Sequence, residues 1–477
     1  MSESPKHDYS KGDEKVALDE QPVTPDTASY GSAQDILGSQ GVDPALDAKM
    51  HIVNNAIDEI GWTPYQWKLF GLNGYGYAVD SQLLLLQSII ATQAGYEFTP
   101  SYPRALTIAV YVGMLLGALY WGLSADIIGR RFAFNVSLFI CSFIALLGFG
   151  GGGILIMDTT VFIEYLPSNK QWVLTWLASW WGLGQAIAGL IAWGFLPPAK
   201  WSCSNPFDEG GLRIYTCHKA DNMGWRYVMY TSRAIVFVMS VARITIIRLK
   251  ETPKYLLGEG KDEQLVADLQ AMAARYNRPC SITVEILAAC GMINSVHGKS
   301  KFSISEITVH FRGLFVTKTL EALISAFLPI TKLGEIMPWL MSTGPMLAGW
   351  MCNWRFLGRK YTMVIGALIT MAFFFAYTQV RTQSQNVGFS CAIGFVLNIY
   401  YGTLYAYTPE VLPSAHRATG NGVAVACNRI MGILSAVIAT CADTSTSVPI
   451  YLCAALFIAM AAVAVAFPFE PYGKRSS

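Results

Sequence analysis

The chain has 477 residues, of which 53% are hydrophobic and only 14% are charged. A soluble domain of ordinary composition carries about 25% charged residues, so the shortfall argues against a surface that faces only water. The formal net charge of +2 argues against nucleic acid as the main partner. The ten cysteines form no CxxC pair and no metal-type cluster. No nucleophilic triad or phosphate-cradling loop is found either, so we expect no enzyme, no metal and no cofactor.

The N-terminal part of the chain is polar. Residues 1–42 are rich in Ser, Asp, Glu, Lys and Pro, which predicts a disordered cytosolic tail and no signal peptide. Leu46–Ile60 then has apolar residues at helical spacing and predicts a short amphipathic helix.

Eight later segments are candidate membrane spans, because a bilayer crossing takes about 20 apolar residues. A polar, basic interval from Lys250 to Lys318 divides them into two sets. The predicted spans are Trp67–Ile90, Leu106–Leu123, Trp172–Leu196, Tyr227–Ile247, Tyr361–Val380, Val387–Tyr407, Val423–Thr440 and Ile450–Phe467.

Two further apolar regions are irregular. Phe132–Leu166 is nearly all apolar but contains a glycine-rich run. We expect it to form a hairpin that turns at Gly150–Gly153, with arms of about 16 residues or 24 Å, short of a hydrocarbon core of about 30 Å. Leu320–Met351 is broken by prolines, including Pro338 and Pro345, so we expect a seventh helix reduced to about Leu320–Ile330 and an interrupted eighth.

A basic turn followed by a Glu-x-x-Pro turn occurs once in each set of spans. The first set has GLSADIIGRR from Gly122 and EYLP from Glu164, and the second has GRK from Gly358 and EVLPSAHR from Glu410. Such internal repeats are typical of transporters, and short Lys- and Arg-rich loops stay in the cytosol. The turns either determine topology alone or latch and release helices as a gate, and we favour the gate. The expected gating residues are Gly122, Asp126, Gly129, Arg130, Arg131, Glu164, Gly358, Arg359, Lys360, Glu410 and Arg417.

These motifs resemble those of the major facilitator superfamily. GLSADIIGRR resembles its loop motif, KETPKYL (Lys250–Leu256) resembles the Pro-Glu-Ser-Pro-Arg motif of its sugar-porter branch, and PEVLPSAHRATG resembles that branch's motif after the tenth helix. With LNGYGYAVDS and LYAYTPEVLP, the chain resembles fungal sugar-transporter-like facilitators related to synaptic vesicle protein 2, from about Val53 to Lys474.

The resemblance implies an all-α polytopic membrane protein with the major facilitator fold. That fold has nominally twelve spans in two six-helix bundles, a central site and alternating access. The expected divisions are a tail with a short helix at 1–60, an N-terminal bundle at 61–249, a cytosolic linker at 250–313, a C-terminal bundle at 314–470 and a cytosolic tail at 471–477.

The chain departs from this pattern in two places. The two turns are 35 residues apart between Gly129 and Glu164, but 52 apart between Gly358 and Glu410. Helices 3 and 4 are therefore expected to be shortened. Helices 7 and 8 are expected to be shortened too, because Trp67 to Gly129 covers 62 residues but Leu314 to Gly358 only 44. Arg355 also stands where a counterpart of Asp126 is expected and should repel Arg359. Two explanations stay open: a splice or gene-model variant that lacks parts of two helix pairs, which we favour, and a genuine shortened form that thins its bilayer.

Polar residues inside the spans are candidates for function, since a charge at mid-bilayer costs at least a few kcal/mol. Proton-using sugar porters carry an aspartate in the first span, so the resemblance favours Asp80 as a proton-coupling carboxylate, with Asp158 as a second candidate. Arg233 and Arg243 are expected at the two membrane interfaces. The candidate solute-binding residues are Gln87, Gln185, Asn398, Asn428 and Arg429.

Cys203 and Cys217 flank a loop that this topology places outside, where a disulfide is plausible. We expect a monomeric multi-pass protein of the plasma membrane or an internal membrane, which moves a sugar or an anionic organic solute with proton coupling. A non-transporting membrane receptor or regulatory protein with a carrier-like fold is the alternative, favoured by the broken seventh helix, by Arg355 and by the long N-terminal tail.

Overall fold

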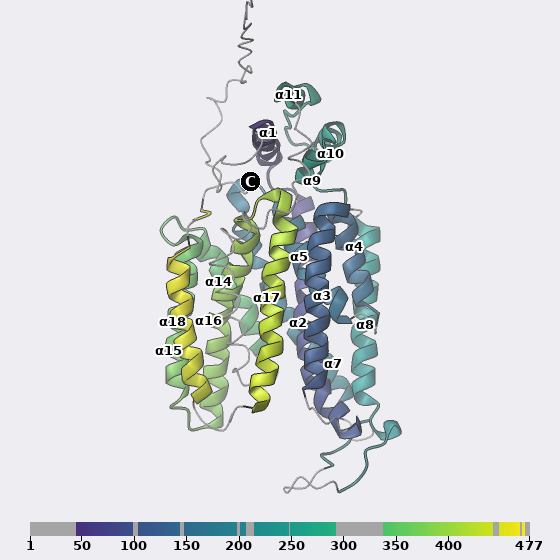
Figure 1. Ribbon diagram of the computed structural model, residues 1–477, viewed down its shortest axis with the longest axis vertical. Coiled ribbons are helices and arrows are strands. Elements are labelled where there is room, and N and C mark those ends of the chain that lie inside the picture. The colour runs from purple at the N-terminus through teal and green to yellow at the C-terminus, as the bar shows by residue number, and fades with distance from the viewer. Residues whose placement is uncertain are drawn as a thin grey trace, which may run out of the picture.

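The computed structural model describes residues 44–98, 104–143, 147–197, 201–206, 214–247, 249–291, 337–441, 448–467 and 470–472. Within these ranges every regular element is a helix, and the longest helices stand side by side in one bundle (Figure 1). The predicted tail at residues 1–42 and the predicted seventh helix, Leu320–Ile330, lie outside the described residues.

Each predicted span coincides with a helix, although the bounds differ by up to eight residues and Trp172–Leu196 is divided between two helices. By length and composition, five of these helices are able to cross a membrane: Ala105–Ile128, Gly224–Thr245, Gly358–Tyr377, Gln383–Glu410 and Val448–Val465. The first half contains α2 (Pro64–Phe98), α3 (Ala105–Ile128), α4 (Arg130–Cys141), α5 (Leu147–Glu164), α6 (Val173–Trp176), α7 (Ser179–Phe195) and α8 (Gly224–Ala242). The described second half contains α14 (Met337–Cys352), α15 (Gly358–Tyr377), α16 (Gln383–Glu410), α17 (Arg417–Cys441) and α18 (Val448–Val465).

The hairpin expected within Phe132–Leu166 is present, but its turn was wrongly placed at Gly150–Gly153. Those glycines lie inside α5, which begins at Leu147, and α4 ends at Cys141. At about 1.5 Å per residue, α4 with its 12 residues is only about 18 Å long. The shortening predicted for this helix pair therefore falls mainly on α4.

The glycines of α5 serve packing rather than turning. A Cβ atom added at Gly117 of α3 would collide with the carbonyl oxygen of Phe149, and one added at Gly152 would collide with that of Met114. Two helix backbones approach this closely only where side chains are absent. The glycine-rich run thus fixes α5 against α3, which carries the first basic turn at its end.

The two halves contact each other along two seams. In the first, a Cβ added at Gly122 of α3 would lie 3.0 Å from Gly422 Cα of α17. In the second, Trp176 Nε1 of α6 donates a hydrogen bond to the carbonyl oxygen of Met346 in α14, at 3.0 Å. The expected interruption of α14 was wrong, because Pro345 lies within a continuous helix.

The predicted linker contains three helices that the sequence pattern did not reveal. α9 (Pro253–Gly258), α10 (Asp262–Arg275) and α11 (Val284–Ala289) gather with α1 (Pro44–Ile60) at one end of the bundle (Figure 1). We call this the charged end, because the basic turns of both halves also lie there, at the start of α4 and of α15.

The close approach of α3 and α5 predicts different outcomes for two glycine substitutions. Gly117→Ala should lower the unfolding midpoint by several degrees, because overpacking costs about 1–3 kcal/mol. Gly189→Ala in α7 is the matched control: a Cβ there meets nothing within 4 Å, and alanine favours a helix by up to about 1 kcal/mol. Thermal unfolding in detergent measures both. Equal midpoints for the two variants would contradict this account of α5.

Candidate functional site

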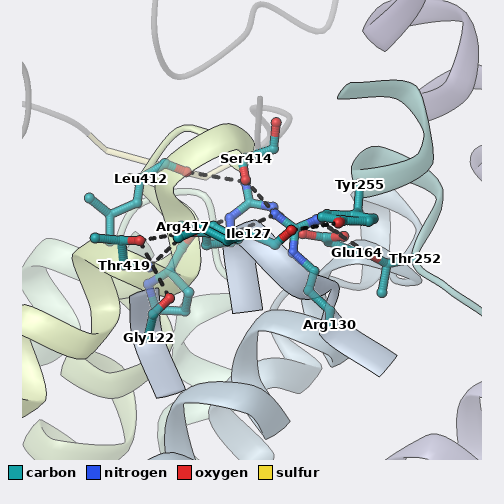
Figure 2. A network of polar contacts seen from close by, with 12 residues as sticks. Gly122, Ile127, Arg130, Glu164, Thr252, Tyr255, Leu412, Ser414, Arg417 and Thr419 are labelled. Carbon is teal, nitrogen blue, oxygen red and sulfur yellow. Dashed lines mark hydrogen bonds and ion pairs between the residues drawn. The ribbon is translucent and has the colours of Figure 1, made fainter. Parts of the chain in front are cut away.

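Arg130 is the centre of a buried network at the charged end (Figure 2). Its Nη1 lies 2.7 Å from Glu164 Oε2, and its Nη2 lies 3.4 Å from Asp126 Oδ1, four residues earlier in the chain. Nη1 also donates to Thr252 Oγ1 at 3.3 Å. The buried Arg130 guanidinium thus has two carboxylates as counter-charges, as buried charges require.

Several contacts of this network cross between the halves. Arg130 Nη2 donates to the carbonyl oxygen of Ser414 at 2.5 Å. The Asp126 carboxylate accepts hydrogen bonds from the amide and the hydroxyl of Thr419, at 2.8 and 2.9 Å. Arg417 Nη1 lies 3.5 Å from Glu164 Oε1. These contacts join the two halves at the charged end, and we call them the latch.

Glu251, which follows α8, closes the network from the side of the linker helices. Its Oε1 accepts hydrogen bonds from the amides of Arg130 and Arg131, at 3.0 and 3.1 Å. The first amides of a helix have no partner within the helix and attract a carboxylate. Gly129 provides the left-handed backbone, with φ of 114°, that lets α4 begin there.

Tyr255 of α9 covers the network from outside the bundle. Its ring lies 5.7 Å from the Arg130 guanidinium carbon, and its hydroxyl donates to the carbonyl oxygen of Ile127 at 3.2 Å. Partial burial raises the pKa of the Tyr255 phenol, so this hydroxyl is protonated near neutral pH, as an unperturbed phenol already is.

The second half repeats this construction. Arg359 and Glu410 form a two-point ion pair, with distances of 3.0 and 2.7 Å. The carboxylate of Glu470 accepts from the amides of Arg359 and Lys360, at 2.9 and 3.0 Å, as Glu251 does in the first half. Arg355 is exposed. The sequence predicted that Arg355 would repel Arg359 and destabilise this turn. Glu410 counters that repulsion, because its carboxylate pairs with the Arg359 guanidinium.

Several members of this site were not among the residues selected from the sequence: Ser414, Thr419, Glu251 and Glu470. A signal for the two glutamates was available, since KETP follows the last helix of the first half and FEPY follows the last helix of the second. Ser414 acts through its carbonyl oxygen, which carries no side-chain signature.

A second buried ion pair joins the halves in the middle of the bundle. Arg429 Nη2 of α17 lies 2.8 Å from Asp80 Oδ1 of α2, and both residues are only 4% exposed. The sequence predicted Asp80 as a proton-coupling residue and Arg429 as a solute-binding residue. In the structure the two side chains form one ion pair.

A series of polar and aromatic contacts joins the helices that carry this pair. Asn428 Nδ2 donates to the Tyr405 hydroxyl at 3.2 Å. The ring of Tyr405 meets that of Trp181 edge to face at 4.9 Å, and Trp181 contacts Tyr77 of α2 at 5.3 Å. We call Asp80, Arg429, Asn428, Tyr405, Trp181 and Tyr77 the central cluster. It draws on α2 and α7 of the first half and on α16 and α17 of the second.

Asp158 lies within the first half and forms a buried ion pair with Arg243. Arg243 also donates to the carbonyl oxygen of Phe134 at 3.1 Å, and its guanidinium carbon lies 3.7 Å from the centre of the Phe134 ring. The interfacial position expected for Arg243 was wrong, because Asp158 provides a counter-charge inside the bundle.

The remaining predicted solute-binding residues are not gathered at one point. Asn398 donates to the carbonyl oxygen of Gly394 in its own helix, at 2.8 Å. Gln87 lines a small cavity of about 40 Å³ with Ser232 and Arg233, and Gln185 is half-buried on α7. Among the described residues, no group of three or more His, Cys, Asp or Glu side chains is arranged to hold a metal ion.

At the end of the bundle opposite the charged end, a disulfide and an ion pair connect parts of the first half. Cys203 and Cys217 form a disulfide. Glu97 at the end of α2 pairs with Arg226 at the start of α8, at 2.7 Å, and the Arg226 guanidinium carbon lies 4.2 Å from the ring centre of Trp225. These contacts join elements of the first half only.

Comparison with known proteins places the chain among membrane carriers. No protein-family model matches it. It is 35% identical to the MFS siderochrome iron transporter 1 of Ceriporiopsis subvermispora, over 93% of the chain and 94% of that protein. It is 24% identical to the synaptic vesicle 2-related protein of Rattus norvegicus, over 89% of the chain and 82% of that protein. The proton:xylose symporter XylE, solved with 6-bromo-6-deoxy-D-glucose, has a TM-score of 0.64 at 16% identity and covers 87% of the chain and 98% of its own.

The latch at the charged end predicts a shift in conformation when Asp126 is removed. Asp126→Ala deletes two hydrogen bonds from Thr419 to a charged carboxylate, each worth about 1.5–3 kcal/mol. The ratio of open to closed charged ends should therefore rise at least about a hundredfold. Distances between spin labels at the exposed positions Arg131 and Arg355, one in each half, measure that ratio.

Asp268→Ala is the control for this experiment. Asp268 pairs with Lys250 at 2.6 Å, within the linker region, and makes none of the contacts between the halves described above. A label-distance distribution that responds equally to both substitutions would show that Asp126 is not part of a latch.

Proposed function

The chain belongs to the major facilitator superfamily of membrane transporters, and on this premise we propose that it moves a small, negatively charged polar solute by alternating access. It is an integral, multi-pass membrane protein. The observation that carries the proposal is the buried Asp80–Arg429 pair, because its two members belong to different halves.

Separation of the halves would leave two buried charges without their partners. An uncompensated charge inside the bundle costs several kcal/mol, so each member needs a substitute before α2 and α17 part. A proton neutralises Asp80, and an anionic group replaces it on Arg429. Proton and anion would therefore move together, which is the coupling of a symporter.

The rest of the central cluster suits a small solute. Asn428 precedes Arg429 in the chain and offers an amide oxygen, and Trp181 and Tyr405 supply aromatic surface. Guanidinium groups bind carboxylates through two parallel hydrogen bonds. An organic carboxylate satisfies Arg429 in this way, whereas a neutral sugar leaves its charge unpaired.

Asp158 is the weaker candidate for proton coupling. It and its partner Arg243 both belong to the first half, so a rigid movement of the halves leaves their ion pair intact. We assign coupling to Asp80 and a positioning role within the first half to Asp158.

The charged end supplies the gate, and we assign it to the cytosol because Lys and Arg in short loops are retained there. Its contacts between the halves must break before solute is released on that side. The ion pairs within each half, such as Arg359 with Glu410, can persist and keep each half rigid.

Substitutions in the central pair should separate coupling from binding. With the protein in proteoliposomes, Asp80→Asn should abolish carboxylate uptake driven by a pH gradient, since the asparagine cannot take up a proton. Solute exchange should remain within about tenfold, because Arg429 stays available. Arg429→Gln should lower both activities at least tenfold, through loss of a charge-assisted bond worth about 1.5–3 kcal/mol.

A panel of organic carboxylates and neutral sugars tests the solute class in the same vesicles, and Arg243→Gln serves as an arginine control outside the central cluster. Gradient-driven uptake that is unchanged in Asp80→Asn would refute the coupling role. Sugar uptake that survives Arg429→Gln would refute an anionic solute.

A second candidate, a solute receptor without transport, is favoured by one observation. α4 has only 12 residues, about 18 Å of helix, and this weakens the first half as a rigid moving body. Saturable binding of a carboxylate without flux in sealed vesicles would support the receptor and exclude the carrier.

A further inference from the structure

The helix before the first span, α1, is fixed to the linker helices through an apolar face. Residues at helical spacing on α1 are buried against residues of α9, α10 and α11 in one hydrophobic cluster. Its fully buried members include Val53, Ala56, Ile57, Ile60, Leu256, Leu257, Leu265, Leu269 and Leu287. α1 therefore belongs structurally to the linker region, although more than 190 residues separate Ile60 from α9 in sequence.

Two polar contacts flank this apolar face. Near the start of α1, Lys49 Nζ lies 2.6 Å from Asp262 Oδ2 of α10. Near its end, the Glu59 carboxylate accepts two hydrogen bonds from Ser281, one from the amide at 2.8 Å and one from the hydroxyl at 2.6 Å. The second contact ties the last turn of α1 to the loop between α10 and α11.

The same last turn reaches the latch. Asp58, next to Glu59, accepts hydrogen bonds from the amide and the hydroxyl of Ser168, at 2.6 and 2.8 Å. Ser168 follows Glu164 by four residues, and Glu164 holds Arg130 in the network of the charged end. The end of α1 thus connects the Ser281 loop to the segment behind Glu164.

We propose that Ser281 is a phosphorylation site whose modification loosens α1 from the linker helices and from the latch. Ser281 is exposed, as are Asn277, Arg278 and Pro279 before it. Arg278 stands three residues ahead of the acceptor hydroxyl, a charge pattern that suits a basophilic serine/threonine protein kinase. In the cell the site requires the orientation proposed above, with the charged end in the cytosol.

Phosphorylation replaces the Ser281 hydroxyl, which donates a hydrogen bond to Glu59, with a negatively charged phosphate. ATP supplies the γ-phosphoryl group: a bond forms between Ser281 Oγ and phosphorus as the bond to ADP breaks, and the hydroxyl proton passes to the kinase's catalytic carboxylate. The phosphate carries a charge of about −1.5 to −2. It would then face the carboxylate of Glu59, which the hydroxyl now contacts at 2.6 Å.

This repulsion should act on the last turn of α1 rather than on the whole helix. The apolar cluster and the Lys49–Asp262 pair still hold the rest of α1. Asp58 lies in the affected turn, so its hold on Ser168 weakens together with the Glu59 contact. Phosphorylation should therefore ease opening of the charged end.

The test uses the full chain in lipid nanodiscs, in which both faces are accessible and no solute is needed. The protein is treated with a purified basophilic kinase and ATP, and phosphate is located by mass spectrometry. Hydrogen–deuterium exchange is then followed in the last turn of α1 and at residues 168–170. We expect phosphate on Ser281 and exchange about tenfold faster in both segments, with Ser281→Ala neither modified nor accelerated.

Glu59→Gln is the discriminating variant, because it removes the repelled charge and keeps a hydrogen-bond acceptor. In this background phosphate on Ser281 should accelerate exchange much less. Failure of the kinase to modify Ser281, or modification that leaves exchange in α1 and at residues 168–170 unchanged, would overturn the proposal. Neither result depends on solute, flux or orientation, so a failure here leaves the proposed transport function standing.

Discussion

The structure depends on one constraint: charges buried between two helix bundles must always have partners. Asp80 and Arg429 satisfy it in the middle of the molecule, and Asp126, Arg130, Glu164 and their neighbours satisfy it at the charged end. An unpaired charge in this environment costs several kcal/mol. The bundles can therefore separate only if protons, solute or water take over these contacts, and that requirement couples movement to binding.

The two levels of pairing have different roles. Ion pairs within one half, Arg359 with Glu410 and Asp158 with Arg243, let a half move as one body. Contacts between the halves include the ion pairs of Asp80 with Arg429 and of Glu164 with Arg417, and hydrogen bonds that involve Ser414 and Thr419. Each of these hydrogen bonds has one charged partner and is worth about 1.5–3 kcal/mol, so the latch opens only when other groups replace its contacts.

The sequence predicts the spans, the family and the repeated turns well, because lipid imposes a strong apolar signal and basic turns stand out against it. The sequence predicts less well which buried charges form ion pairs with each other. Asp80 and Arg429 are recognisable as costly residues, but their contact arises only when distant helices pack. The glycines of α5 suggest a turn, yet they serve close packing against α3. The linker helices escape notice since their buried leucines are spread through a polar segment.

The most direct test of this account is a double-mutant cycle on the central pair. Unfolding midpoints in detergent would be measured for Asp80→Asn, Arg429→Gln and the variant that carries both. Each single substitution leaves a buried charge unpaired, so both should be destabilising. The double variant should be more stable than the sum of the two effects predicts, with a coupling energy of about 1–3 kcal/mol. Additive effects would mean that the two charges do not depend on each other, and the coupling of proton and solute through them would then be untenable.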